Sequence, residues 1–240
     1  MADPDRLTPA SASQRRVPSP GLLFGCTLLL IICGIAIWVG VRCQKQRALI
    51  LFIEDKGGSV EFNGMQPEWA DELLAKVLDD NAMGGFRGLK GIDLTDTEFT
   101  DADLQRLSGE SSIETLGLAN TKITDAGLQH LNGLTHMVSL GLRRTQITDE
   151  GLTHLSGMTN LGWLYLQSTH VTDAGLARLS QLPNVRSLHL YGTSVTDAGL
   201  EHLSHLSRLE YLNLTKTNVT DAGVEAFGER FPDWRITKWK

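Results

Sequence analysis

Cysteine is nearly absent from this chain of 240 residues, which contains three: Cys26, Cys33 and Cys43. All three lie within or directly after an apolar stretch near the N-terminus, and the rest of the chain contains none. A disulfide framework needs more thiols than this, and a zinc site needs cysteines or histidines at ligand spacing, so both are excluded. The sequence therefore predicts no metal and no cofactor.

Positive charge is also in deficit, because 22 Lys and Arg residues are set against 28 Asp and Glu residues, for a net charge of −6. Such a balance argues against nucleic acid or an anionic surface as the partner. The motifs Gly-x-Ser-x-Gly, the phosphate loop and His-Glu-x-x-His are all missing. A hydrolase would have only His189 and scattered acids to use. We therefore expect a protein that is not an enzyme and has no catalytic residues.

Charge of either sign is missing from residues 21–41, GLLFGCTLLLIICGIAIWVGV. At about 1.5 Å per residue, a helix over this stretch is about 31 Å long, close to the ~30 Å hydrocarbon core of a bilayer. We predict an uncleaved, single-pass transmembrane helix over residues 21–41, acting as a signal anchor after a disordered tail over residues 1–20. A cleaved signal peptide is the alternative, although its apolar region is normally only about 7–15 residues long.

The membrane orientation rests on the basic residues that flank this stretch. Arg15 and Arg16 precede it, whereas Arg42, Lys45 and Arg47 follow it, so the positive-inside rule discriminates weakly. A short N-terminal tail that ends in two arginines favours a cytoplasmic N-terminus. We therefore expect the bulk of the chain to be extracytoplasmic.

The second half of the chain repeats one motif, Thr-x-Val-Thr-Asp-Ala-Gly-Leu, every 24 residues. Copies begin at Thr97 (divergent), Thr121, Thr145, Thr169, Thr193 and Thr217. A fixed period of this length is typical of a solenoid. Each repeat also contains a Leu-x-x-Leu-x-Leu segment that alternates like a strand, and leucines at a spacing of three that are typical of a helix. We predict an α/β solenoid over residues 86–240, with one parallel strand and one helix per repeat.

Residues 42–85 are predicted to form a juxtamembrane helix and an N-terminal cap for the solenoid, whose open end must be covered. The first helix is expected to stop at Gly57 and Gly58. A short strand is expected over Ser59–Phe62, because its residues alternate. A second helix is expected after Pro67.

These repeats resemble the leucine-rich repeat family, and in particular its Thr-Asp-Ala-Gly-Leu subclass. That subclass is found in membrane-anchored bacterial proteins of unassigned function and is similar to the cysteine-containing repeats of F-box adaptors. The resemblance implies a right-handed solenoid with strands on the concave face and helices on the convex face. The threonine that begins each motif occupies the position of the adaptors' cysteine. Trp234 replaces the cysteine of the family's usual ending, so the last strand is expected to be placed differently.

The polar residues of the motif have structural explanations. Its second threonine is placed to cap the helix, and the following aspartate lies in the first turn, where the helix dipole favours negative charge. Its glycine suggests a point where neighbouring coils approach too closely for a Cβ. A column of six aspartates from Asp101 to Asp221 is an alternative cation site, but capping explains it without a ligand. His130, His154 and His202 recur at one helix position and are interpreted as solvated histidines.

The positions that the repeat leaves free lie on the outward side of the strands, and aromatic residues gather there in the later repeats. Aromatic and arginine side chains contribute most of the binding energy at protein interfaces. We predict a protein or peptide ligand on this concave face. The expected ligand-binding residues are Arg143, Trp163, Tyr165, Gln167, His189, Tyr191, Tyr211 and Asn213. One alternative is that bulky strand residues pair only for stability; another is an adaptor or scaffold that binds through its convex helices or its cap.

Overall fold

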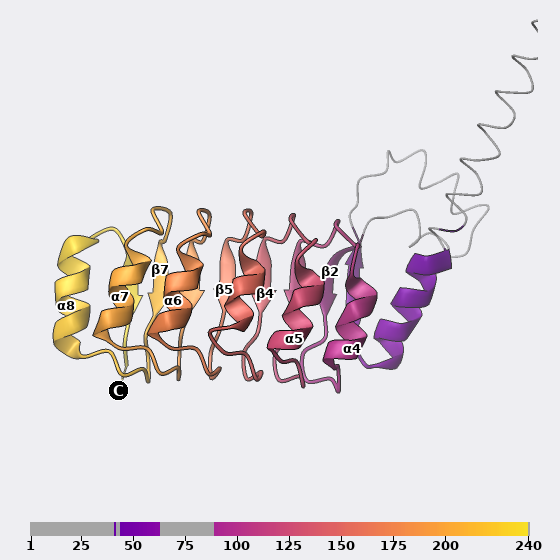
Figure 1. The fold of residues 1–240 in the computed structure, drawn as a ribbon, viewed down its shortest axis with the longest axis horizontal. Helices are drawn as coiled ribbons and strands as arrows, with labels where there is room; N and C mark the ends of the chain where they lie inside the picture. Colours follow the sequence, from indigo (N-terminus) through magenta and orange to yellow (C-terminus); the bar gives the residue numbers. More distant parts are fainter. Residues whose placement is uncertain (1–40, 42–43, 63–88, 240) are drawn as a thin grey trace, which may run out of the picture. The chain divides into compact units, whose positions relative to one another are not determined.

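The computed structural model describes residues 41, 44–62 and 89–239 (Figure 1). The predicted tail over residues 1–20, the transmembrane helix over residues 21–41 except Val41, and the second cap helix after Pro67 lie outside the described residues. Within the described part of the chain, no helix combines the length and apolar character needed to cross a membrane. Contacts divide the chain into two compact units, residues 1–42 and 43–240.

The second unit is built on one 8-stranded sheet whose strands follow sequence order. The strands are β1 (Ser59–Phe62), β2 (Leu89–Asp93), β3 (Thr115–Gly117), β4 (Ser139–Gly141), β5 (Trp163–Tyr165), β6 (Ser187–His189), β7 (Tyr211–Asn213) and β8 (Arg235–Thr237). β1 pairs antiparallel with β2, and every later pair is parallel. Paired residues in the parallel strands follow the period of the motif, as in Leu140 and Leu164. The parallel strands of the predicted α/β solenoid are thus confirmed.

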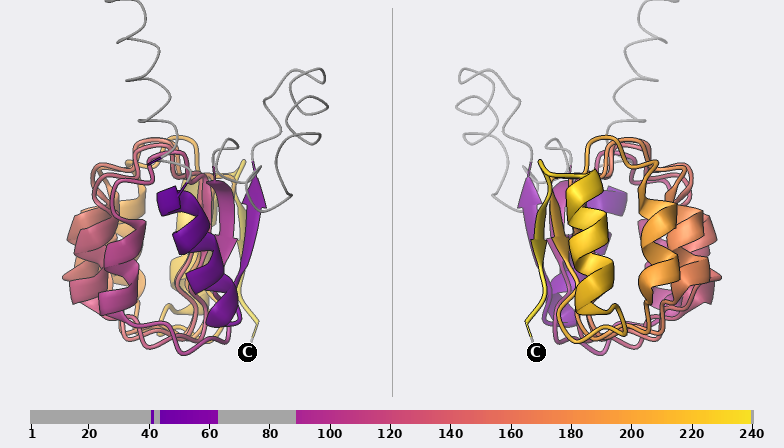
Figure 2. Two further views of the ribbon diagram at one scale, coloured as in Figure 1. Left: turned by 90° about the vertical axis from the view of Figure 1, so that its right-hand side faces the viewer. Right: turned by 90° about the vertical axis from the view of Figure 1, so that its left-hand side faces the viewer.

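Helical segments form a second layer on the opposite side of the coils (Figures 1 and 2). They are α4 (Asp101–Leu104), η1 (Gln105–Leu107), α5 (Asp125–Leu128), η2 (Gln129–Leu131), η3 (Gly151–Leu155), α6 (Asp173–Leu179), α7 (Asp197–Leu203) and α8 (Asp221–Arg230), where η marks a 3₁₀ helix. The expectation of one regular helix per repeat was too simple, because η3 is entirely 3₁₀. Leu206 and Leu209 lie in the loop after α7 rather than on its face. A short coil leaves few residues for the helix once the chain must return to the strand layer.

Leucine, isoleucine and valine fill the space between the layers in stacked columns. In one coil, for example, Leu188, Leu190 and Val195 are all 0% exposed. The threonine that begins each motif is buried or nearly so, and its hydroxyl donates to the carbonyl three residues earlier, at 2.6 Å from Thr145 Oγ1 to Leu142 O. This bond satisfies the hydroxyl, which explains how a polar residue occupies a position within the core.

The Thr-Asp-Ala-Gly segment connects each coil to the next. Asp101 accepts hydrogen bonds from the Thr124 N–H (2.9 Å) and hydroxyl (2.6 Å) of the following coil. The Thr124 hydroxyl in turn accepts from Ala126 N–H at 3.3 Å, as expected for a helix cap. The helix dipole was therefore an incomplete explanation of the aspartate, because its carboxylate bridges two coils.

The glycine of the motif makes room for this bridge. A Cβ at Gly127 would lie less than 3.0 Å from the Asp101 carboxylate oxygen of the preceding coil. The same relation holds for four further pairs: Asp125 with Gly151, Asp149 with Gly175, Asp173 with Gly199, and Asp197 with Gly223. The predicted close approach of neighbouring coils is thus confirmed, and the group that needs the space is a carboxylate.

Within the described residues, no aspartate of a preceding coil bonds to Thr100, and the first coil provides a substitute. Asp103 stands at the glycine position of the motif and accepts from the Thr100 N–H (3.0 Å) and hydroxyl (2.8 Å), the same two donors that the later threonines direct to the preceding coil. Lys56 Nζ adds a third bond at 3.3 Å. Burial raises the pKa of Asp103, but the hydrogen bonds from Thr100 and Lys56 outweigh it and hold the pKa below its ordinary value.

Both ends of the second unit are capped. A helix spans residues 44–55 and is followed by Gly57 (φ 82°), which is suited to a helix C-terminus. Its side chains Leu49, Ile50 and Ile53 join the core. Figure 2 shows this helix across one end of the space between the layers and α8 across the other. The strand expected over Ser59–Phe62 is confirmed as β1.

The C-terminal end is closed by aromatic side chains. The Phe231 ring stacks on Trp234 with ring centroids 4.4 Å apart, and Phe227 lies 4.8 Å from Phe231. β8 remains parallel to β7 and in register with it, with Leu212 opposite Ile236. The expectation that the last strand would be placed differently was wrong, because Trp234 precedes the strand and packs into the cap instead.

Candidate functional site

Three rows of side chains cross the outward side of the sheet, which we call the strand face. The first row is Gly91, Thr115, Ser139, Trp163, Ser187, Tyr211 and Arg235. The second row is Asp93, Gly117, Gly141, Tyr165, His189, Asn213 and Thr237. The third row follows the strand ends and is Thr95, Ala119, Arg143, Gln167, Tyr191 and Thr215. The eight residues predicted to bind a ligand all belong to these rows, so the structure brings them together.

Three rings in the later repeats form a continuous stack. Tyr165 and His189 stack with centroids 4.7 Å apart and an interplanar angle of 23°. His189 and Tyr211 follow at 5.0 Å and 44°. The Ser187 hydroxyl lies 3.1 Å from His189 Nε2. These contacts hold the three rings against one another, as expected if bulky strand residues pair for stability.

Burial lowers the pKa of His189 below its ordinary value. The imidazole is therefore neutral at neutral pH, since the ordinary value is about 6.5. A neutral ring between two tyrosines adds apolar area and hydrogen-bonding capacity to the stack rather than charge.

Trp163 is 41% exposed and adjoins the stack at the start of β5. Arg143 is exposed in the turn after β4. Tyr191 is partly exposed, and Lys216 Nζ lies 5.3 Å from its ring centroid. We call Arg143, Trp163, Tyr165 and Tyr191 the aromatic patch.

The two predicted amide residues differ from the patch. The Asn213 carboxamide oxygen accepts from Thr215 N–H at 3.0 Å, which ties this side chain to the turn after β7. The Gln167 Oε1 atom is buried and, within the described part of the chain, has no hydrogen-bond partner. Gln167 therefore keeps an acceptor that a small shift of its side chain can offer to a ligand.

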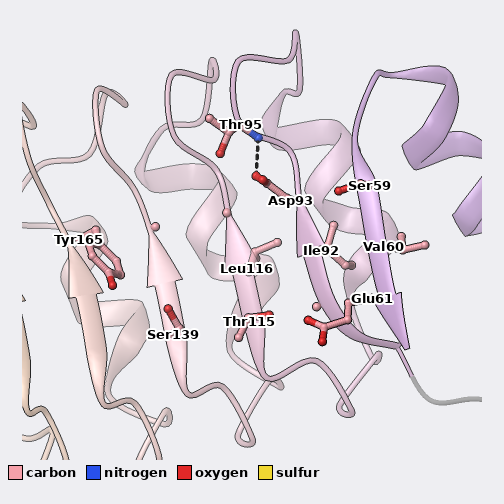
Figure 3. A pocket seen from close by; sticks show the side chains of 13 residues that line it. Ser59, Val60, Glu61, Ile92, Asp93, Thr95, Thr115, Leu116, Ser139 and Tyr165 are labelled. Carbon is pink, nitrogen blue, oxygen red and sulfur yellow. Dashed lines mark hydrogen bonds between the residues drawn. The ribbon is translucent and has the colours of Figure 1, made fainter. Parts of the chain in front are cut away.

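A groove of about 400 Å³ lies on the same face, between β1 and Tyr165 (Figure 3). We call it the acidic groove; its lining includes Ser59, Glu61, Gly91, Asp93, Thr95, Thr115, Gly117, Ser139, Gly141 and Tyr165. A Cβ at Gly91 would lie 3.0 Å from Glu61 Oε2, and one at Gly117 would lie 2.6 Å from Asp93 Oδ1. Each carboxylate therefore leans over the glycine of the neighbouring strand. Asp93 Oδ1 also accepts from Thr95 N–H at 3.0 Å.

Sequence reasoning missed this groove. The predicted site was confined to the later repeats, where the aromatic residues gather, and the position of β1 beside β2 was not foreseen. The available signal was that three successive strands each have a glycine on their outward side, Gly91 in the first row and Gly117 and Gly141 in the second. Within the described residues, no cluster of three or more His, Cys, Asp or Glu side chains is arranged to hold a metal.

Two segments of the chain, residues 133–156 and 205–228, match the family model described as Leucine Rich repeat. No curated protein matches the chain. Among solved structures, internalin C2 of Listeria monocytogenes is 22% identical with a TM-score of 0.47, over 66% of this chain and 83% of that one. An internalin F structure of the same organism is 18% identical (TM-score 0.48), over 68% of this chain and 51% of that one.

A leucine-rich repeat protein of Leptospira interrogans is 20% identical with a TM-score of 0.46, over 60% of this chain and 34% of that one. This chain therefore spans about half of the internalin F chain and about a third of the Leptospira chain. The family match at residues 133–156 and 205–228 shows that this chain contains leucine-rich repeats, and the same strand and helical segment recur in the other coils.

Proposed function

We propose that this chain is a binding module that recognises a protein or peptide on its strand face, centred on the aromatic patch. The observation that carries the proposal is Trp163, whose indole is 41% exposed although its strand neighbours Leu164 and Gly162 are buried. A large indole in contact with water gains free energy when a partner covers it, and tryptophan is among the residues enriched in binding hot spots.

The surroundings of Trp163 favour a specific site over an isolated apolar residue. Tyr165 lies two positions further along the same strand, and Tyr191 follows the next one. Arg143 supplies a charged, planar group at the edge of the patch, suited to bidentate hydrogen bonds. The sheet ladder holds these backbones in register before a ligand arrives, so binding orders only side chains.

Removal of the aromatic patch tests this proposal. Peptides selected from a random phage-displayed library on the full-length chain in detergent should bind Trp163→Ala/Tyr165→Ala/Tyr191→Ala at least about 30-fold more weakly, as expected for a loss of 2 kcal/mol or more at a hot spot. Trp239→Ala is the matched control, because it removes an indole that is 74% exposed outside the patch. Circular dichroism must show that the triple variant remains folded.

Retention of the selected peptides by the folded triple variant would refute binding at this patch. The convex helices or the N-terminal cap would then be the binding surface, as in the adaptor alternative. Crosslinking of the bound peptides to the protein would identify which of these surfaces they occupy.

We also propose that residues 21–41 anchor the chain in a membrane and that the repeat domain is extracytoplasmic. The support is the length of this stretch and its lack of charged residues. The full-length chain should stay in the membrane fraction after alkaline carbonate extraction, and proteases added to intact cells should digest residues 89–239. A repeat domain that is digested only after lysis would overturn the orientation.

A further inference from the structure

We infer that the acidic groove binds the Arg or Lys side chain of an extended peptide that continues onto the aromatic patch. This inference rests on the proposed function and adds the chemistry of the ligand. Its starting point is the lining of the groove, which contains the carboxylates of Glu61 and Asp93, several hydroxyl groups and, among the described residues, no Lys, Arg or His.

Both carboxylates are available to a ligand. The Glu61 and Asp93 residues are exposed, and within the described part of the chain neither forms an ion pair. Asp93 uses one oxygen for Thr95 N–H, which fixes the direction of its side chain. Figure 3 shows Glu61 and Asp93 on neighbouring strands, with Tyr165 at the opposite side of the groove. A cation at this end of the groove gains charge-assisted bonds to these carboxylates. The Tyr165 ring lies on β5, three strand spacings or about 14 Å from Asp93 on β2, and remains available to the rest of the ligand.

The distribution of charge over the rest of the strand face points to the same ligand. The carboxylates of Glu61 on β1 and Asp93 on β2 lie at one end of the strand face, whereas Arg143 follows β4 and Arg235 lies on β8. A cationic side chain is therefore attracted near β1 and β2 and repelled near Arg143 and Arg235. This asymmetry gives an extended peptide one preferred position.

Gly141 indicates that the groove is more than a consequence of how the strands pack. A Cβ at Gly91 would lie 2.6 Å from Thr115 Oγ1 and 3.0 Å from Glu61 Oε2, and one at Gly117 would lie 2.6 Å from Asp93 Oδ1, so neighbouring side chains of the fold explain both glycines. The nearest heavy atom to a Cβ at Gly141 is the Gly117 Cα at 3.7 Å, which is an ordinary contact. Nothing in the fold requires glycine at position 141, and its missing side chain leaves the floor open beside Tyr165.

The geometry also predicts a spacing in the ligand. Tyr165 lines the groove and belongs to the aromatic patch, so the two surfaces are continuous. From β2, which carries Asp93, to β5, which carries Trp163, is three strand spacings, or about 14 Å. An extended peptide advances about 3.3 Å per residue. The cationic residue and the residue that covers Trp163 should therefore be about four positions apart.

Peptide selection on the full-length chain tests the inference. Wild type should enrich Arg or Lys about four positions from an apolar residue, and synthetic peptides of that pattern should bind Glu61→Gln/Asp93→Asn about three- to tenfold more weakly, given the modest strength of exposed charge pairs. Asp93→Asn keeps the acceptor for Thr95 N–H. Asp96→Asn is the matched control, because it removes one exposed carboxylate outside the groove and should leave binding unchanged.

A second variant blocks the space without removing charge. Gly141→Val places a strand-favouring side chain on the floor between Asp93 and Trp163. It should keep the wild-type free energy of unfolding and weaken the binding of peptides that reach from the carboxylates to Trp163. Trp163→Ala should weaken the binding of every selected peptide, and the peptides that still bind should keep their cationic residue.

The possible failures are distinct. Selected peptides without a cationic position, or cationic peptides that bind Glu61→Gln/Asp93→Asn and Gly141→Val as well as wild type, overturn the groove inference and leave the binding proposal intact. Selected peptides that bind Trp163→Ala and the triple patch variant as tightly as they bind wild type overturn the proposed function. A wild-type chain that enriches no peptide refutes both.

Discussion

The contact between Asp197 and Gly223 predicts that one substitution changes sign with its background. Gly223 lies near the start of α8, and the three atoms nearest to an added Cβ all belong to Asp197, each closer than 3.0 Å. Asp197 accepts from Thr220 N–H at 2.7 Å and from the Thr220 hydroxyl at 2.7 Å. In Gly223→Ala, the carboxylate must shift by roughly 1 Å, which breaks bonds of this length.

The size of the effect follows from two opposing terms. Hydrogen bonds to a charged group contribute about 1.5 kcal/mol each at the low end of their range, which is appropriate for an exposed pair, so their loss costs about 3 kcal/mol. Alanine in place of glycine within a helix returns about 0.5–1 kcal/mol. Gly223→Ala should therefore lower the free energy of unfolding by about 2 kcal/mol, the difference of these terms.

The same substitution should be neutral or stabilising once the carboxylate is gone. In the Asp197→Ala background, Gly223→Ala should gain about 0.5–1 kcal/mol, so the cycle should show a coupling of about 3 kcal/mol. Gly228→Ala is the matched control in α8, because the nearest atom to its Cβ is Ile236 Cδ1 at 4.0 Å, and it should stabilise the protein. Urea unfolding followed by circular dichroism measures all four free energies. Additive effects, or a Gly223→Ala variant as stable as Gly228→Ala, would refute the explanation of the motif.

Three further predictions concern pH and length. The pKa of Asp103 is lowered in the folded state, so wild type should lose stability as the pH falls below about 3.9, and Asp103→Asn should lose less over that range in thermal melts. The pKa of His189 is also lowered, so its neutral form stabilises the fold above pH ~6.5 and this contribution should decline as the pH falls; His189→Phe should flatten the dependence, and NMR titration should place the imidazole pKa below 6.5. Deletion of residues 145–168 should be tolerated better than deletion of residues 145–156, because only the first preserves the register; equal unfolding midpoints would contradict this.

Much of the fold was predictable because each coil repeats the same short sequence pattern. The alternation around Leu140 and Leu164 predicted which side chains face inward, and the pairing of these two residues agrees with it. The capping role of Thr124 was predictable from its residue type, since a hydroxyl before a helix satisfies a free N–H. The 3₁₀ form of η3 was not, because the helical geometry of a short coil depends on how it packs against its neighbours.

The candidate site was predictable in part. The positions of Trp163 and Tyr165 on the strand face follow from the pleat of a single strand, which the leucine spacing reveals. The acidic groove requires Glu61 to lie beside Gly91, and these residues come from different segments that pair antiparallel. No periodicity in the sequence relates them, because β1 lies outside the repeat.

The period, the inward and outward sides of each strand and the starts of the helices could be predicted from the residue pattern, because they depend on residues a few positions apart. The roles of the polar residues became clear only from the folded chain, because their partners lie one coil away. Asp101 accepts hydrogen bonds from Thr124 across that distance, and Gly127 has no Cβ that would collide with the Asp101 carboxylate. In the first coil, Asp103 accepts the hydrogen bonds that later threonines donate to the preceding coil. Residues of β1 and the small residues of the first repeats together line the groove. Contacts between coils fix the positions of these carboxylates, and such contacts form only when the chain is folded.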